Sequence, residues 1–291
     1  MVSGLWSNKS FNLFGGGLMQ EQLQQAMSVI RGIKIPEIPE EVMALDSELK
    51  SPMANAQTVA QIIERNAVIA GELLHLVNQP MFKTKLAVAS IQEAVVVLGF
   101  KNLYNLVVAK GFERMFQENQ LQKEIMEHSI EIATSMAFLS EYVEGVSRDE
   151  AYLIGLFHNV GCLLLAQKDQ RAYRGIFEAS RVEPMLAFES EAEHFQANHN
   201  FIGALVGKKW QLSIDFINAI ILHHHSEFER IKNDRVRALI AMLQLSEKMI
   251  SEISFYAYQG DQAHQLQQRC LSELMIDEEV LNDLRHYLLT H

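Results

Sequence analysis

The sequence predicts an all-α fold, and three observations support this prediction. Over residues 42–116, apolar side chains recur at steps of three and four, which is the spacing of one face of a helix. No segment there shows the convincing alternation of apolar and polar residues that indicates a strand. Residues 90–93 (SIQE) and 147–150 (SRDE) resemble capping boxes that begin helices, and Gly99 and Gly145 are placed to end helices.

The composition is that of a globular protein. The chain has 291 residues, of which 48% are hydrophobic, so it can bury a substantial core as one large domain or two smaller ones. It carries 25 basic and 36 acidic residues, and the net charge of −11 opposes general attraction to nucleic acid or anionic lipid. We therefore expect no nucleic acid partner.

Two further features favour a cytoplasmic protein. Cys162 and Cys270 lack the spacing of metal ligands, and no basic segment followed by an apolar signal core is present. The longest apolar stretch, residues 153–166, is too short to span a membrane and is interrupted by His158 and Asn159. We expect this stretch to be a core helix, with no membrane as a partner.

The first third of the chain is expected to contain a tail, a connector and a set of short helices. Residues 1–17 include three consecutive glycines and read as a loose tail, and residues 20–33 read as a polar helix. The prolines of residues 35–41 (IPEIPEE) indicate a rigid connector. Residues 90–99 and 103–115 are then expected to form successive helices.

The rest of the chain is organised around histidines on apolar helix faces. His128 falls on the stripe of the helix at 122–143, and His158 lies beside Asn159 within the apolar run 151–166. His199 lies in register with the stripe of residues 192–210. A helix capped by Ser213 leads into His223, His224 and His225, and residues 235–250 and 277–289 read as closing helices joined by a polar, Gln-rich connection at 259–268.

Four helices that each direct a histidine inward indicate a shared site. A buried imidazole costs free energy unless it is hydrogen-bonded or bound to a metal. A single such histidine is usually a satisfied core residue, but imidazole nitrogens also suit iron, manganese, zinc or nickel. Carboxylates, which would neutralise a dication, are absent from the motif, since the residue after His158 is the neutral Asn159. The spacing alone does not establish a metal.

The order of these residues resembles the HD phosphohydrolase superfamily: His128, then His158 and Asn159, then His199, then His223 and His224. The surrounding motifs are similar to the HDOD domain over residues 35–225, namely IPEIPEE, residues 61–78, 90–99 and 151–161, and the segment 198–225. The resemblance implies an all-α fold in which an N-terminal helical bundle packs on an HD-like bundle. It also implies a role in bacterial signalling, and many such domains are thought to be non-catalytic.

The resemblance also sets the expected domains. Residues 1–34 would be a tail and leading helix, and residues 231–291 would be closing helices. The HDOD domain would occupy residues 35–230, divided into an N-terminal helical half at 35–120 and an HD-like half at 121–230.

The chain departs from the HD enzyme pattern where catalysis would depend on charge. HD enzymes have Asp after the second histidine, where this chain has Asn159, and their late metal-binding Asp falls near Ser246. The resemblance therefore implies a vestigial metal site without catalytic residues, and a cofactor that is either absent or a weakly bound Fe, Mn, Zn or Ni ion. Its residues would be His128, His158, Asn159, His199, His223 and His224.

Three functions follow as hypotheses. The first is a regulatory module that is non-catalytic or weakly catalytic and acts by binding a partner protein or a small signal. The second is a metal-dependent phosphohydrolase that acts on a nucleotide or phosphodiester, with the histidines as ligands. The third is a scaffold without a ligand. The absence of carboxylates beside the histidines favours the first, and the oligomeric state is not predicted.

Overall fold

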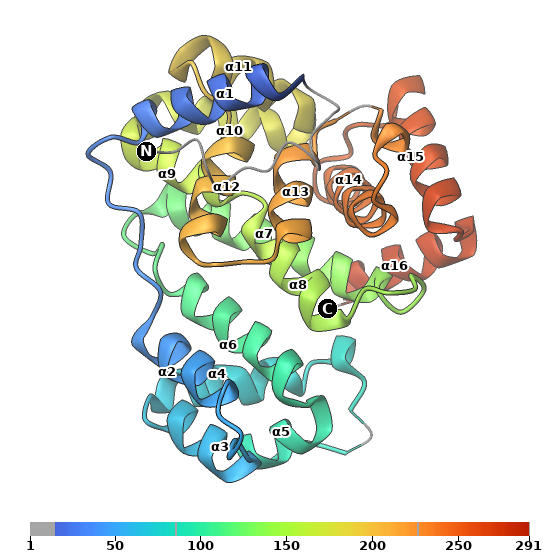
Figure 1. Cartoon of the computed structure of the whole chain (residues 1–291). Coiled ribbons are helices and arrows are strands. Elements are labelled where there is room, and N and C mark those ends of the chain that lie inside the picture. The colour runs from blue at the N-terminus through green and yellow to red at the C-terminus, as the bar shows by residue number, and fades with distance from the viewer. Residues whose placement is uncertain (1–14, 85, 226, 291) are drawn as a thin grey trace.

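A computed structural model describes residues 15–84, 86–225 and 227–290, and within these ranges it contains helices and no strands (Figure 1). The predicted all-α fold is confirmed. The helices form an N-terminal lobe, a larger second bundle and a C-terminal pair that packs on the second bundle. The predicted tail lies mostly outside the described residues, although Gly15, Gly16 and Gly17 belong to the first helix, α1 (Gly15–Val29).

The N-terminal lobe follows the connector at residues 35–39. Its helices are α2 (Glu40–Leu49), α3 (Ala56–Glu64), α4 (Ala67–Val77), α5 (Ile91–Leu98) and α6 (Phe100–Glu113), with a short 3-10 turn at Pro80–Phe82. The Ser90 hydroxyl accepts a hydrogen bond from the Glu93 amide, and Gly99 follows α5 with a φ of 79°, so the predicted start and end of this helix are confirmed.

The second bundle surrounds α7 (Gln120–Leu139), which packs against α8 (Arg148–Phe157), α9 (Val160–Lys168) and α14 (Asp234–Phe255). The chain between α9 and α14 forms α10 (Gln170–Val182), α11 (Pro184–Phe195), α12 (His199–Lys209) and α13 (Ile214–Leu222), followed by a 3-10 turn at Phe228–Arg230. The predicted Ser213 cap is observed, and Pro184 is the first residue of α11. Ser147, in contrast, makes no capping hydrogen bond, so the second capping box is wrong at this residue.

Two predicted continuous helices are broken, and both breaks lie at the histidines. The run 151–166 divides into α8 and α9, with His158 and Asn159 in the bend between them. Residues 192–210 divide into α11 and α12 at Gln196, whose φ is 60°, and His199 becomes the first residue of α12. An apolar stripe continues across such a bend, which is why periodicity alone does not reveal it.

The C-terminal region is more helical than predicted. The Gln-rich segment 259–268 is not a connection, because most of it lies in α15 (Asp261–Leu274), and α16 (Glu278–Thr290) follows. Helix α15 packs along α14, and α16 contacts α7 and α14. The buried Ala263, Cys270 and Leu271 supply the apolar contacts of α15 that outweigh its polar composition.

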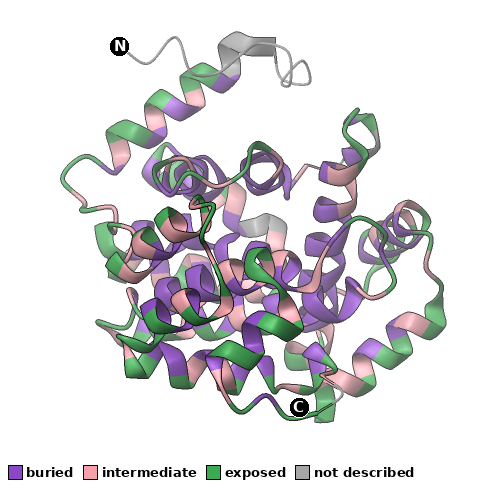
Figure 2. Cartoon of the chain, turned by 60° about the horizontal axis from the view of Figure 1, so that its bottom comes forward, coloured by how far each residue is buried: buried purple, intermediate pink, exposed green. Residues whose placement is uncertain are grey.

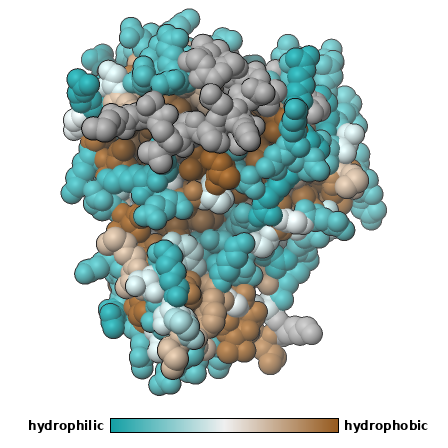
Figure 3. Space-filling view, viewed as in Figure 1, coloured by the Kyte–Doolittle hydropathy of each residue, from teal (hydrophilic) through white to brown (hydrophobic). Residues whose placement is uncertain are grey.

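Buried residues line the inner faces of the helices throughout the two lobes (Figure 2). The face shown in Figure 3 is largely hydrophilic and carries several apolar areas, one of them at the lower edge of the N-terminal lobe. Within the described ranges, no helix combines the length and apolar character that crossing a bilayer would require.

Candidate metal centre

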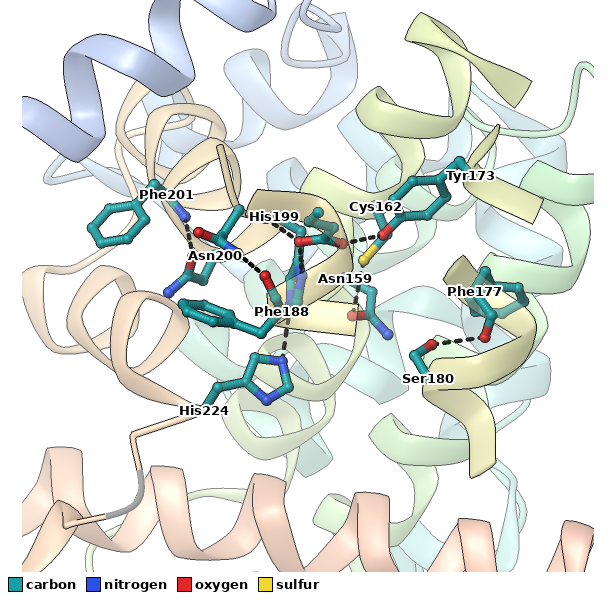
Figure 4. Close-up of polar contacts among 12 residues, drawn as sticks. Asn159, Cys162, Tyr173, Phe177, Ser180, Phe188, His199, Asn200, Phe201 and His224 are labelled. Atoms are coloured by element: carbon teal, nitrogen blue, oxygen red, sulfur yellow. Dashed lines mark hydrogen bonds and ion pairs between the residues drawn. The ribbon is translucent and has the colours of Figure 1, made fainter. Parts of the chain in front are cut away.

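Histidines from two segments of the sequence meet in the second bundle. His199 begins α12, while His223 and His224 follow the end of α13. The Nε2 atom of His199 lies 3.2 Å from Nε2 of His223 and 3.1 Å from Nε2 of His224. All three side chains are buried, and one ligand nitrogen from each lies within 4.8 Å of the others. Figure 4 shows His224 below His199, with the dashed contact between them.

Hydrogen bonds at the opposite ring nitrogens fix how these imidazoles are oriented. Nδ1 of His223 lies 2.7 Å from the Ile220 carbonyl oxygen, and Nδ1 of His199 lies 2.8 Å from Oε2 of Glu191. His158, in the bend before α9, makes the same kind of contact with the Gly155 carbonyl oxygen at 2.5 Å. Because a carbonyl or carboxylate oxygen only accepts, Nδ1 must carry the proton in each ring.

The inward-facing nitrogens therefore need something between them. With their protons on Nδ1, the neutral rings of His199 and His223 present Nε2 lone pairs to each other at 3.2 Å, and these repel unless a proton or a metal ion lies between them. Nε2 of His158 is also buried without a hydrogen-bond partner. Two nitrogens bound to one tetrahedral metal at about 2.0–2.1 Å are about 3.3 Å apart, close to the spacing found here. The residues present therefore fit a divalent metal.

Two buried carboxyl groups adjoin the histidines, so the expectation that the site lacks them is wrong. Glu191, on α11, is in contact with His199, and Oε1 of Glu247, on α14, lies 3.7 Å from Nε2 of His158. Glu191 was missed because it lies in the acidic run 189–193, which looks solvated. Its spacing from Phe188 and Phe195 was the available signal for an inward position.

Burial keeps most of this cluster uncharged when no metal is bound. It lowers the pKa of His223 to about 3 and holds the pKa values of His158 and His224 well below their usual range, with the neighbouring histidines adding to the effect. Burial raises the pKa of Glu247 to about 8, although the charge of His199 partly opposes this. His158 and Glu247 are then both neutral at pH 7, and their contact is not an ion pair.

His199 differs from its neighbours. Burial opposes its protonation, but the negative charge of Glu191 and its hydrogen bond to Nδ1 outweigh burial and raise the pKa of His199 well above its usual value. A proton on its Nε2 can therefore relieve the repulsion among the three nitrogens in the metal-free protein. Metal binding would have to displace this proton.

The remaining predicted site residues lie close to the cluster or outside it. His128 is buried on α7 with its ring 6.0 Å from that of Phe177, but it is not in the group of ligand atoms within 4.8 Å. Oδ1 of Asn159 accepts a hydrogen bond from the Cys162 thiol at 3.3 Å. The Ser246 hydroxyl is hydrogen-bonded to that of Ser135, and the carboxyl near this position comes from the next residue, Glu247.

A pocket of about 310 Å³ opens onto the cluster from the side where α15 lies. His223, His224, Gln244 and Glu247 form its inner wall. The outer wall consists of Tyr258, Gln262, Gln265, Leu266 and Arg269, with Pro184 also contributing. The Gln244 amide donates to the His223 and His225 carbonyl oxygens, which leaves its buried Oε1 without a donor. Small molecules therefore have a polar approach to the cluster.

The all-helical fold and the ordered histidine cluster define a protein of the HD type. The family model for the HDOD domain matches residues 35–226, and the chain belongs to this family. The sequence-based resemblance to the HDOD domain is therefore confirmed.

Solved structures of similar fold span nearly the whole chain. One, from Marinobacter aquaeolei VT8, is a signal transduction protein by provisional assignment. It is 20% identical with a TM-score of 0.67, and the match covers 97% of this chain and 65% of that one. Another, from Shewanella amazonensis SB2B, is provisionally a metal-dependent phosphohydrolase. It is 17% identical with a TM-score of 0.65, and the match covers 94% and 96% of the two chains. At these identities the likeness concerns the fold.

An uncharacterised protein from Treponema pallidum (strain Nichols) is 22% identical over 196 residues, which is 66% of this chain. The chain spans only 38% of the length of that relative.

Proposed function

We propose that this protein is a regulatory module that holds one divalent transition metal at His199, His223 and His224 and responds to a small signal or a partner protein. The observation that carries the proposal is the convergence of three Nε2 atoms, with His199 and His223 fixed by their Nδ1 contacts. Imidazole ligands suit Fe, Mn, Zn or Ni. His158, whose ring centroid lies 5.7 Å from that of His223, and Glu247, which adjoins His158, are further groups beside this site.

Regulation is favoured over catalysis because a bridging carboxylate is missing. Asn159 is neutral, and its side-chain oxygen is already engaged by the Cys162 thiol. A second metal would therefore lack the anion that usually links a metal pair. The pocket beside His224 offers a small signal access to the centre, and the provisional signalling assignment of the Marinobacter structure agrees with this role.

Metal binding is the first test. Protein purified without a chelator or a histidine tag is expected to contain about one transition metal ion per chain, measured by elemental analysis. After chelation, it should rebind Zn²⁺ or Mn²⁺ in calorimetric titration. His199→Ala should abolish binding, because it removes the nitrogen that faces both other ligands. His264→Ala, on the exposed face of α15, is the control and should bind as the wild type. Equal binding by the His199 variant would refute the site.

A phosphohydrolase is the second candidate, and Glu247 is the observation that favours it. A bound dication would polarise a phosphoryl oxygen, and the buried Glu247 could add negative charge or accept a proton. We nevertheless expect hydrolysis of bis(p-nitrophenyl) phosphate to stay near background with Mn²⁺ or Zn²⁺, since Asn159 supplies no bridging charge. Metal-stimulated turnover that is lost in both His199→Ala and Glu247→Gln would establish the enzyme instead.

A further inference from the structure

A chain of buried hydrogen bonds lies behind His199, on the side away from the other histidines. The Tyr173 hydroxyl donates to Oε1 of Glu191 at 2.5 Å. Oε2 of Glu191 accepts from the backbone amide of His199 and from its Nδ1, both at 2.8 Å. Figure 4 shows Tyr173 and His199 on opposite ends of this chain, with His224 beyond His199. Tyr173 and His199 are each 1% exposed and Glu191 is fully buried.

Three donors converge on the two oxygens of Glu191. A carboxyl group with a donor on each oxygen serves only as an acceptor, so Glu191 is a carboxylate here. A buried carboxylate is stable only when its oxygens are hydrogen-bonded, and this condition is met. A full negative charge therefore lies one imidazole ring away from the three converging nitrogens.

We propose that Glu191, held by Tyr173, is the positioning residue of the metal centre. It holds a proton on Nδ1 of His199, so that Nε2 is the nitrogen that faces His223 and His224 and that becomes the metal ligand once its own proton is displaced. At the Nδ1 side of His199, Glu191 also supplies the negative charge that Asn159 does not provide. Partners of this kind orient histidine ligands and raise their basicity in many metal sites. The inference rests on the proposed metal-binding function.

A purely structural role for Glu191 must be separated from this one. Asn198, which precedes α12, makes no side-chain cap, and Glu191 binds the first amide of that helix instead. Loss of Glu191 could therefore weaken the helix start without any effect on a metal. The test needs a variant that keeps the hydrogen bonds and removes only the charge, together with a readout that helix capping does not affect.

Glu191→Gln is that variant, because an amide can still accept from Nδ1 with its oxygen and face the Tyr173 hydroxyl with its NH₂ group. We expect the Nδ1–H resonance of His199 to remain protected in ¹H–¹⁵N spectra of the metal-free protein. Zn²⁺ affinity measured by titration should fall by about 10–100-fold. Glu191→Ala should lose both the protected resonance and the affinity.

Tyr173→Phe offers a milder variant with a matched control. It should weaken Zn²⁺ binding by several-fold, since Glu191 loses one donor. Tyr152→Phe removes a similar buried Tyr–Glu hydrogen bond, from Tyr152 to Glu113 at 3.1 Å, which lies outside the cluster. It should leave Zn²⁺ affinity unchanged. Equal losses in both Phe variants would mean that general destabilisation, not positioning, is being measured.

Two results would overturn the inference. Wild-type affinity in Glu191→Gln would show that the charge has no effect on the metal, and a His199 without a protected proton on Nδ1 would show that Glu191 does not hold that proton. Should the wild-type protein bind no metal, the proposed function would fail, whereas the Nδ1–H readout in the metal-free protein would still decide the positioning role. If Glu191→Ala does not fold, Glu191→Gln and Tyr173→Phe still give both readouts.

Discussion

Replacing Gly161 by alanine is expected to lower the free energy of unfolding by about 3 kcal/mol and to abolish metal binding. A Cβ atom at position 161 would lie 2.0 Å from the carbonyl oxygen of His199 and 2.6 Å from its carbonyl carbon. These are backbone atoms at the start of α12, so no side-chain rotation relieves the overlap. Helix α12 must move away from α9, and His199 moves with it. Urea denaturation and Zn²⁺ titration would measure the two effects.

Gly175→Ala is the matched control for this prediction. Gly175 lies in α10 on an exposed face, and a Cβ there would meet nothing within 4 Å. Alanine at this position should raise the free energy of unfolding by about 0.5–1 kcal/mol through its higher helix propensity, and metal affinity should not change. If the Gly161→Ala variant were as stable as the wild type, the backbone of His199 could not lie as close to Gly161 as described.

Some parts of the site could be predicted from the sequence because they depend on local patterns of residues. The apolar-face positions of His128, His158, His199 and the His223–His224 pair predicted one shared site. His199, His223 and His224 do come together, whereas His128, placed by the same reasoning, lies outside their group. Local hydrogen bonding likewise made the Ser90 cap and the helix after Ser213 predictable. Such features depend on a few neighbouring residues, which a sequence displays directly.

The features that were missed depend on contacts across the fold. The bends at residues 158–159 and at Gln196 follow from how α9 and α12 pack, and periodicity continues through both. Helix α15 is polar in composition, and its contact with α14 determines its structure. Glu191 and Glu247 look like ordinary surface charges in the sequence, and only the tertiary structure buries them.

Their burial changes the interpretation of Asn159. From the sequence, a neutral residue after His158 suggested that the metal site had lost its anionic charge. In the structure, one carboxyl group contacts His199 from behind and another lies near His158. The carboxyl groups lie at other positions than in the HD pattern, and Glu191, together with Glu247 once it loses its proton, could neutralise a single metal ion among three histidines. A pair of metal ions would lack a carboxylate to bridge them, because Asn159 is neutral.

Glu247→Gln is expected to make the metal-free protein more stable at alkaline pH, by roughly 3 kcal/mol above pH 8. The pKa of Glu247 is raised from 4.5 to about 8 by burial, so the folded state retains a proton that the unfolded state releases across this window. The stability that this carboxyl group contributes is fully present below pH 4.5 and is lost as the pH rises through 8. Each unit of pKa shift corresponds to about 1.4 kcal/mol in the free energy of unfolding. Relaxation of the protein around the charged Glu247 carboxylate reduces the total to roughly 3 kcal/mol. Glutamine has no such proton to lose.

The measurement is the free energy of unfolding from pH 5 to pH 9 with a chelator present, for wild type and variant. His158, His223 and His224 have lowered pKa values, and their contribution is lost as the pH falls below 6.5 in both proteins, so the difference between the two curves isolates Glu247. Glu178→Gln, on an exposed part of α10, should follow the wild-type curve. Saturating Mn²⁺ should remove the alkaline decline of the wild type, because a dication near Glu247 stabilises the carboxylate. Parallel wild-type and Glu247→Gln curves over the whole range would mean that Glu247 is solvated and does not belong to the metal centre.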